Sequence, residues 1–159
     1  MNAAQELVEE FTRRGLRIVT VESCTGGALA SAITDVSGSS AVFTHGFVTY
    51  SEEAKIALGQ YLGPWGYAPM QKAIQEHTVY SPQVAVEMAR VGRLLSNAQV
   101  GVGITGRLEE GQGVVDVAVS MQGRPLELPV RMTFTGEGSR REMKEEIIRQ
   151  TIELVLRTI

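Results

Sequence analysis

Small polar side chains and two glycines stand together in the segment Ser23-Cys24-Thr25-Gly26-Gly27. The residues just before it, Ile18 to Val21, are β formers and predict a strand, and the apolar run from Ala28 predicts a helix. Amides at a helix start are unpaired and carry partial positive charge, and glycine lets a ligand approach the backbone. The segment therefore predicts an anion or oxyanion site beside Ser23, Thr25, Gly26 and Gly27, although an ordinary strand-to-helix turn could have the same sequence.

Two more polar groups follow predicted strands: Tyr50 with Ser51 and Lys55, and Thr105 with Gly106. In open α/β sheets, ligands bind beyond the carboxyl ends of the parallel strands. A hydroxyl nucleophile there needs a base, and lysine is the available one, because no histidine follows these strands. Lysine can act as a base when burial or a nearby cation lowers its pKa. From these residues alone, the favoured interpretation is that Ser51 only caps a helix and that Lys55 is solvated.

Cys24 is a second possible nucleophile, because a helix start lowers the pKa of a thiol. With no histidine nearby in the sequence, a buried structural thiol is the favoured interpretation. The single cysteine and the two histidines, at positions 24, 45 and 77, do not have the spacing of zinc ligands. We expect neither a metal nor a cofactor.

Length and composition limit the class of protein. A chain of 159 residues predicts a single domain over 1–159, and a net charge of −3 argues against strong nucleic-acid binding. No apolar stretch is long enough to span a membrane, and the acidic amino terminus does not resemble a signal peptide. Together with the single cysteine, these features predict a cytoplasmic protein without membrane partners.

The apolar periodicity and the turn residues place the elements that must position these side chains. The predicted helices are 2–14, a run from 28, 51–59, a run from 81 and 142–157, and the predicted strands are 18–21, 41–50, 100–105, 114–121 and 126–134. Helices alternate with strands before two strands occur together, which predicts an α/β fold whose mixed sheet has helices on both faces.

Residues 59–70 combine glycines and prolines with Tyr61, Trp65 and Tyr67. Glycine and proline interrupt regular structure, while aromatic side chains favour burial or a partner. We expect a folded surface loop or an interface here. Because such side chains are enriched at interfaces, we predict a homo-oligomer, with a dimer as the first choice.

Several segments taken in order resemble the CinA C-terminal domain family, which includes nicotinamide mononucleotide deamidases. They are Thr20 to Gly27, Gly38 to Phe43, Gly46 to Ser51 with Glu53 to Lys55, Val84 to Met88, and Gly103 to Gly106. The resemblance covers nearly the whole chain. It implies a three-layer α/β/α sandwich and a metal-free hydrolysis of the carboxamide of nicotinamide mononucleotide to nicotinate mononucleotide and ammonia. A small-molecule nucleotide is the implied substrate.

The resemblance also assigns roles to residues. It implies that Ser40 is the nucleophile, that Lys55 is its base and that Tyr50 stands between them in the proton path. Ser23 and Thr105 would hold the reacting group or stabilise the oxyanion. An arginine that opens the last helix would contact the substrate. Arg140 matches it best by spacing, and Arg141 is the alternative.

Three segments depart from the family pattern. A charged segment, 107–113, replaces a loop rich in glycine and proline, residues 136–140 replace a tighter turn, and the segment around Trp65 looks inserted. Glu109 and Glu110 would oppose a phosphate near the first of these segments. The alternative function is therefore a non-catalytic module that binds a nucleotide or a partner protein.

Overall fold

The computed structural model describes residues 1–125, 129–136 and 138–159. Its helices are α1 (Ala3–Arg14), α2 (Ala28–Thr34), α3 (Glu52–Gln60), α4 (Pro64–His77), α5 (Pro82–Ser96) and α6 (Arg140–Thr158), with a short 3₁₀ turn, η1 (Ser39–Ala41). Its strands are β1 (Ile18–Glu22), β2 (Phe43–Val48), β3 (Val100–Glu109), β4 (Gln112–Met121) and β5 (Val130–Thr135).

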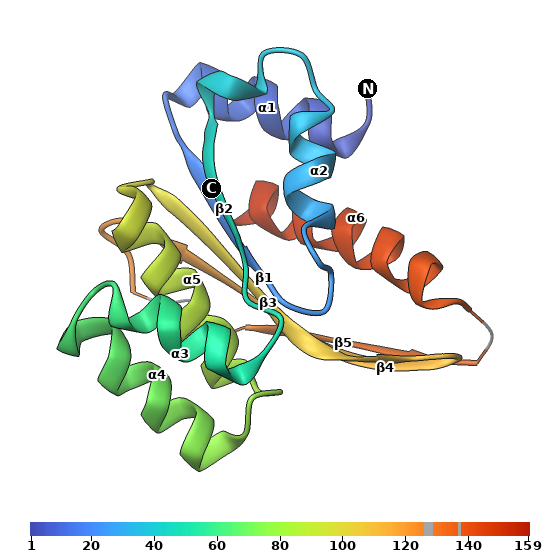
Figure 1. The fold of residues 1–159 in the computed structure, drawn as a ribbon. Coiled ribbons are helices and arrows are strands. Elements are labelled where there is room, and N and C mark those ends of the chain that lie inside the picture. The colour runs from blue at the N-terminus through green and yellow to red at the C-terminus, as the bar shows by residue number, and fades with distance from the viewer. Residues whose placement is uncertain (126–128, 137) are drawn as a thin grey trace.

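The strands form one mixed sheet in the order β2-β1-β3-β4-β5. β1 pairs in parallel with β2 and β3, whereas β4 is antiparallel to both of its neighbours. In Figure 1, α1, α2 and α6 lie on one side of the sheet and α3, α4 and α5 on the other. A hydrophobic cluster fills the space under each group of helices. The predicted α/β/α sandwich with a mixed central sheet is confirmed.

Most helix starts follow the capping signals in the sequence. Ser51 and Ser81 accept hydrogen bonds from the amides of Ala54 and Val84, and Pro82 occupies the first turn of α5. α6 begins two residues before the predicted start, because Ser139 caps it and Glu142 returns the hydrogen bond. The start of α6 therefore lies beside the hairpin formed by β3 and β4 (Figure 1).

The loop predicted over 59–70 is wrong, because α4 already begins at Pro64. Pro64 suits the first turn of a helix, where its missing amide hydrogen has no intrahelical partner to lose. Gly59 and Gly66 serve packing rather than a turn: a Cβ on Gly66 would lie 2.4 Å from the Gly59 carbonyl oxygen. The glycines let α3 and α4 approach closely, which local composition does not distinguish from a loop.

The strand predicted to end before Gly106 is also longer in the structure. β3 continues to Glu109, and β4 begins at Gln112 rather than at 114, so 107–113 forms a hairpin with a two-residue turn. Gly111 in that turn has a φ of +77°, which favours glycine. The charged side chains of this segment indicated a loop, but Arg107 and Glu109 belong to β3 and are exposed to solvent.

The strands at the two ends of the sheet, β2 and β5, also differ in their bounds from the predicted ones. The one predicted over 41–50 is shortened to β2, because η1 precedes it and α3 is capped immediately after it. The one predicted over 126–134 corresponds to β5, and residues 126–128 lie outside the described residues. Across the described parts of the chain, no helix is both long and apolar enough to cross a membrane.

Candidate active site

The parallel strands end at a common edge, which we call the carboxyl edge. Glu22, the last residue of β1, lies opposite Val48 of β2 and Ile104 of β3. The Ser23 amide then donates to the Ile104 carbonyl at 2.9 Å. The side chains that follow these three strands therefore meet, as the positions of the polar groups predicted.

Lys55 is the buried cation of this edge. It lies in the second turn of α3 and its side chain is buried. Its Nζ donates to Ser23 Oγ at 2.9 Å and to the Thr49 carbonyl at 2.7 Å. The Ser51 cap fixes the start of α3 and hence the direction from which Lys55 enters. Lys55 is therefore buried beside the Ser23 hydroxyl and is not solvated.

Burial lowers the pKa of Lys55 to about 8, against the weaker opposing effects of Cys24 and Glu52. Desolvation penalises the charged amine because water no longer solvates it. A useful fraction of the side chain is therefore neutral near physiological pH and can take a proton from the hydroxyl that it contacts.

A buried carboxylate holds the loop that carries Ser23. Glu22 accepts hydrogen bonds from Thr25 Oγ1 at 2.7 Å and from the amides of Leu29 and Ala30 at 2.8 and 3.0 Å. The amides at the start of α2 are thus already used, which argues against an anion site there. Thr25, predicted to bind substrate, is buried and bonded to Glu22 instead.

Gly26 and Gly27 supply the turn of this loop, with φ values of +62° and +97°. Other residues rarely adopt such values, so both glycines are needed for the backbone path. Within the described residues, the amides of Cys24 and Thr25 donate to no backbone carbonyl. They are the candidate donors to an oxyanion on Ser23.

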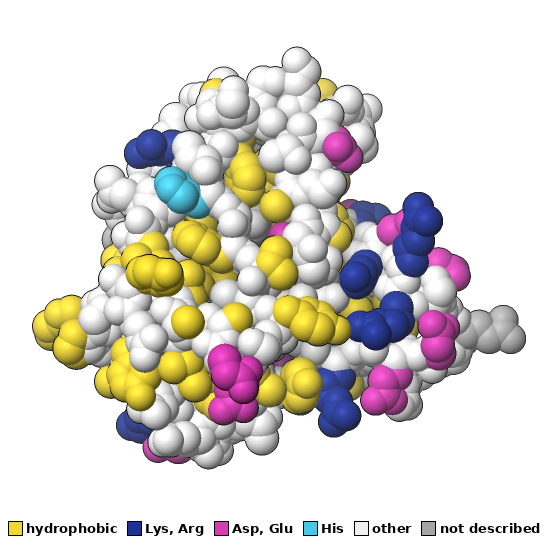
Figure 2. Space-filling view, viewed as in Figure 1, with side chains coloured by type: hydrophobic (Ala, Val, Ile, Leu, Met, Phe, Trp, Pro, Cys, Tyr) yellow, Lys and Arg dark blue, Asp and Glu magenta, His cyan; other side chains and the backbone are white. Residues whose placement is uncertain are grey.

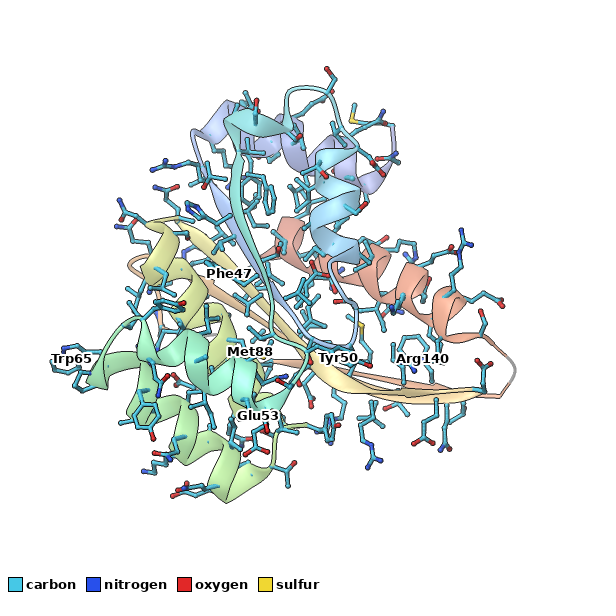
Figure 3. All side chains as sticks on the ribbon, in the orientation of Figure 1. Phe47, Tyr50, Glu53, Trp65, Met88 and Arg140 are labelled. Carbon is cyan, nitrogen blue, oxygen red and sulfur yellow. The ribbon has the colours of Figure 1, made fainter. Side chains whose placement is uncertain are left out.

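Thr105 and Tyr50 reach this edge but contact other groups. Thr105 is fully buried, and its hydroxyl donates to the Val79 carbonyl at 3.0 Å, which ties the loop before α5 to β3. Tyr50 is exposed, and its phenol oxygen accepts from Arg140 Nη2 at 3.3 Å. Tyr50 therefore lies at the mouth of the site beside Arg140 (Figure 3) and not between a serine and Lys55.

A cavity of about 190 Å³ opens in front of Ser23. Its walls come from the Ser23 loop, the ends of β2 and β3, the loop before α5 and the start of α6. They are Ser23, Cys24, Tyr50, Tyr80, Gly106, Arg107, Leu108, Glu109 and Arg140. The cavity is smaller than most ligand clefts, so it fits a ring-sized group whose remainder lies over the rim.

Of the two arginines that open α6, Arg140 lines this cavity, whereas Arg141 is exposed and pairs with Glu145 at 3.4 Å. The hydrogen bond to Tyr50 raises the pKa of Arg140. Lys144 lies one helical turn further along α6, with its Nζ 3.7 Å from the position of a Cβ on Gly26. Two cations of α6, Arg140 and Lys144, thus lie beside the loop that carries Ser23.

The structure does not bring Ser40 to this site. Ser40 lies in η1, just before β2 begins, whereas Tyr50 and Lys55 follow the end of β2. A strand of six residues separates its two ends by about 20 Å, so Ser40 and Lys55 lie at opposite edges of the sheet. This geometry therefore does not support the predicted pairing of Ser40 with Lys55. The hydroxyl that lies beside the Lys55 amine is that of Ser23.

The Cys24 side chain is buried, as the favoured interpretation expected. Burial raises its pKa to about 11, although Lys55 and Lys144 act in the opposite direction. The thiol therefore stays protonated near neutral pH and is a poor nucleophile.

Sequence reasoning missed Glu22, Lys144 and Tyr80. An acid at the end of a strand, four residues before a pair of glycines and a helix start, was the available signal for Glu22. Among the described residues, no cluster of three or more His, Cys, Asp or Glu could hold a metal ion. The absence of a metal and of a cofactor stays a prediction.

The fold and the contact between Ser23 and Lys55 define an α/β protein with a candidate hydrolase site at the carboxyl edge of its sheet. The chain belongs to the CinA C-terminal domain family, whose model matches residues 1–159. It is 28% identical to the competence/damage inducible protein CihA of Agrobacterium tumefaciens, with a TM-score of 0.80 over 97% of this chain and 92% of that one. A CinA superfamily protein of Klebsiella pneumoniae gives 27% identity and a TM-score of 0.81, over 96% and 92% of the two chains.

Curated relatives differ in their names. The nicotinamide-nucleotide amidohydrolase PncC of Escherichia coli K12 is 39% identical over 106 residues, 67% of this chain and 59% of the relative. A CinA-like protein of Chloroherpeton thalassium is 37% identical over 122 residues, 76% of this chain and 27% of the relative. The chain thus aligns with only part of the length of these relatives.

Proposed function

We propose that this protein is a serine–lysine amidohydrolase that deamidates nicotinamide mononucleotide to nicotinate mononucleotide and ammonia. The observation that carries the proposal is the 2.9 Å hydrogen bond between the buried Lys55 amine and Ser23 Oγ. A lysine with a lowered pKa beside a hydroxyl can replace the histidine of other hydrolases. The proposed nucleophile is thus Ser23, and Lys55 is its base.

The neutral Lys55 amine takes the proton of the Ser23 hydroxyl while Oγ attacks the carboxamide carbon. The tetrahedral oxyanion is stabilised by the amides of Cys24 and Thr25. Lys55 returns the proton to the leaving nitrogen, ammonia departs, and an ester to Ser23 remains. Water then attacks the ester, Lys55 accepts its proton, and the carboxylic acid and the free hydroxyl are formed.

The choice of substrate has two supports. One relative is named as a nicotinamide-nucleotide amidohydrolase, and the cavity has room for one ring with its carboxamide at Ser23. Arg140 at the rim and Lys144 beside the Ser23 loop are placed to attract a phosphate outside the cavity. The ribose and the phosphate would lie over this rim, where their binding energy assists the chemistry.

A non-catalytic module that binds a nucleotide or a partner is the alternative. The observation that favours it is Glu109, which lines the cavity and belongs to the hairpin that departs from the family pattern. A carboxylate near the phosphate would weaken the binding of a nucleotide. Such a module would bind without releasing ammonia.

Release of ammonia from nicotinamide mononucleotide tests the proposal. The wild-type protein is expected to release one ammonia for each nicotinate mononucleotide formed, and Ser23→Ala to release none above background. Ser40→Ala is the matched control, because it removes the same hydroxyl from an exposed residue in η1. Binding without ammonia release in the wild-type protein would favour the alternative function.

A further inference from the structure

Tyr80 forms a wall of the cavity that the proposed mechanism does not use. The residue is 47% exposed, so its ring is available to a ligand. The bond from Thr105 to the Val79 carbonyl and the Ser81 cap of α5 hold the backbone on both sides of it. Thr78 has a φ of +68°, which a β-branched residue rarely adopts, and this too indicates a tightly determined loop.

The Tyr80 ring already contacts a cation. The Arg107 guanidinium carbon lies 5.3 Å from the ring centroid, within the range of a cation–π interaction. Arg107 also lies 3.8 Å from Glu109 across an exposed ion pair. The guanidinium of Arg107 on this ring thus has the Glu109 carboxylate near it. Both residues belong to the hairpin and not to the Ser23 loop.

The ring of a nicotinamide nucleotide resembles the Arg107 guanidinium in two respects: it is planar, and it carries a positive charge. Its nitrogen is bonded to the ribose and is quaternary, so the ring is planar and positively charged. The reduced, dihydro form has the same carboxamide, ribose and phosphate, but its ring is neutral. A cation–π wall would distinguish these two forms, whereas simple apolar packing would not.

We propose that Tyr80 is a specificity-determining residue that selects substrates with a positively charged aromatic ring. The inference rests on the proposed function, because it uses the same cavity and carboxamide. The substrate ring takes the place of the Arg107 guanidinium on Tyr80, and Arg107 moves toward Glu109. The carboxamide then faces Ser23, and the phosphate faces Arg140.

The test measures dissociation constants of oxidised and reduced nicotinamide mononucleotide by calorimetry in a Ser23→Ala background, where the substrate is not consumed. Tyr80→Leu removes the aromatic face and keeps an apolar side chain, whereas Tyr80→Phe keeps the face. Tyr61→Leu is the matched control, since Tyr61 is exposed and does not line the cavity.

We expect Tyr80→Leu to weaken the oxidised nucleotide by about 3- to 30-fold and to leave the reduced form nearly unchanged. Tyr80→Phe and Tyr61→Leu should change neither constant. Equal weakening of both forms, or no weakening, would overturn the inference. Ammonia release by the wild-type protein is measured separately: its absence would refute the proposed function, while charge-selective binding at Tyr80 would still stand.

Discussion

The amine of Lys55 has two hydrogen-bond neighbours, a carbonyl oxygen and the Ser23 hydroxyl. Only the hydroxyl can lose a proton, so this contact determines what the amine can do. Burial of the amine also lowers its pKa. A surface lysine would remain charged and could not act as the base.

The first prediction concerns this pair. Ser23→Ala and Lys55→Met are each expected to lower kcat by at least about 100-fold, because either change removes the proton transfer. Residues that act as one unit are not additive, so the double variant should be no slower than either single variant. Circular dichroism checks that the variants fold. Losses that multiply in the double variant would show two independent roles.

The second prediction is a pH dependence. The Lys55 amine must be neutral to accept a proton, and its pKa is about 8. Activity, measured as kcat/KM, should therefore rise with pH and level off above this value. Lys55→Arg should abolish activity across the same range, because a guanidinium stays charged. A wild-type rate that falls as the pH passes through 8 would contradict the role of Lys55 as base.

At the scale of elements, the loop between β1 and α2 depends on Glu22. This side chain is fully buried and accepts three hydrogen bonds from the loop and the helix start. It links the end of β1 to α2 and so fixes the backbone that carries Ser23. Its negative charge also complements the dipole of α2.

We therefore predict that Glu22→Ala lowers the free energy of unfolding by about 2–4 kcal/mol, because buried amides lose their acceptor. Activity in the folded protein should fall as well. The control is Glu53→Ala, an exposed acid in the first turn of α3 (Figure 3), which should change stability by about 0.5 kcal/mol or less. Chemical denaturation measures both, and similar losses would argue against a special role of Glu22.

The hairpin of β3 and β4 carries the fourth prediction. Glu109 lines the cavity, and Glu110 lies near enough to Arg140 to help raise its pKa. Replacing both by Gln should lower KM for nicotinamide mononucleotide by a few-fold, roughly 0.5–1 kcal/mol, because like-charge repulsion is removed. Nicotinamide riboside, which lacks the phosphate, should change less. An equal change in both KM values would place the carboxylates away from the phosphate.

Sequence patterns predicted the layers of this fold but not the lengths of two elements. The capping serines and the β-branched run before Ser23 are local signals, and they placed α3, α5 and β1 correctly. The glycines of α3 and α4 serve a contact between helices, and residues 107–113 pair as a hairpin of β3 and β4. Both features depend on packing, so local composition indicated loops instead.

The residues of the candidate site were also predicted only in part, because local signals do not show how the chain packs. Ser23, Lys55 and Arg140 follow strand ends or open a helix, and the structure brings all three to one edge. Ser40 is near Lys55 in the sequence, but β2 separates them because an extended strand moves the chain away. Thr25 and Thr105 have the right positions, yet their hydroxyls are used to hold neighbouring loops.

At the scale of the whole molecule, charged and apolar side chains occupy different regions. Figure 2 shows apolar side chains gathered over β2, α3 and α4, whereas basic and acidic side chains surround the hairpin and the start of α6. Tyr61 and Trp65 are each 80% exposed in the apolar region, and Val48 of β2 is also exposed. This region lies apart from the charged mouth of the candidate site.

We predict that this apolar region contacts a second copy of the chain, because exposed aromatic side chains favour burial in an interface. Sedimentation of the wild-type protein should show a dimer. A double variant, Tyr61→Ser with Trp65→Ser, should dissociate to the monomer more readily than the wild-type protein. The control is Lys72→Ser, which changes an exposed residue outside the aromatic pair. A wild-type protein that remains monomeric at high concentration would contradict this prediction.

The central claim is that Ser23 attacks the carboxamide with Lys55 as its base. It is tested most directly by mass spectrometry of the protein quenched rapidly during turnover of nicotinamide mononucleotide. The account predicts an acyl group on the peptide that contains Ser23, its absence in Ser23→Ala and its persistence in Ser40→Ala. An acyl group on Ser40 or Cys24, or full ammonia release by Ser23→Ala, would contradict it.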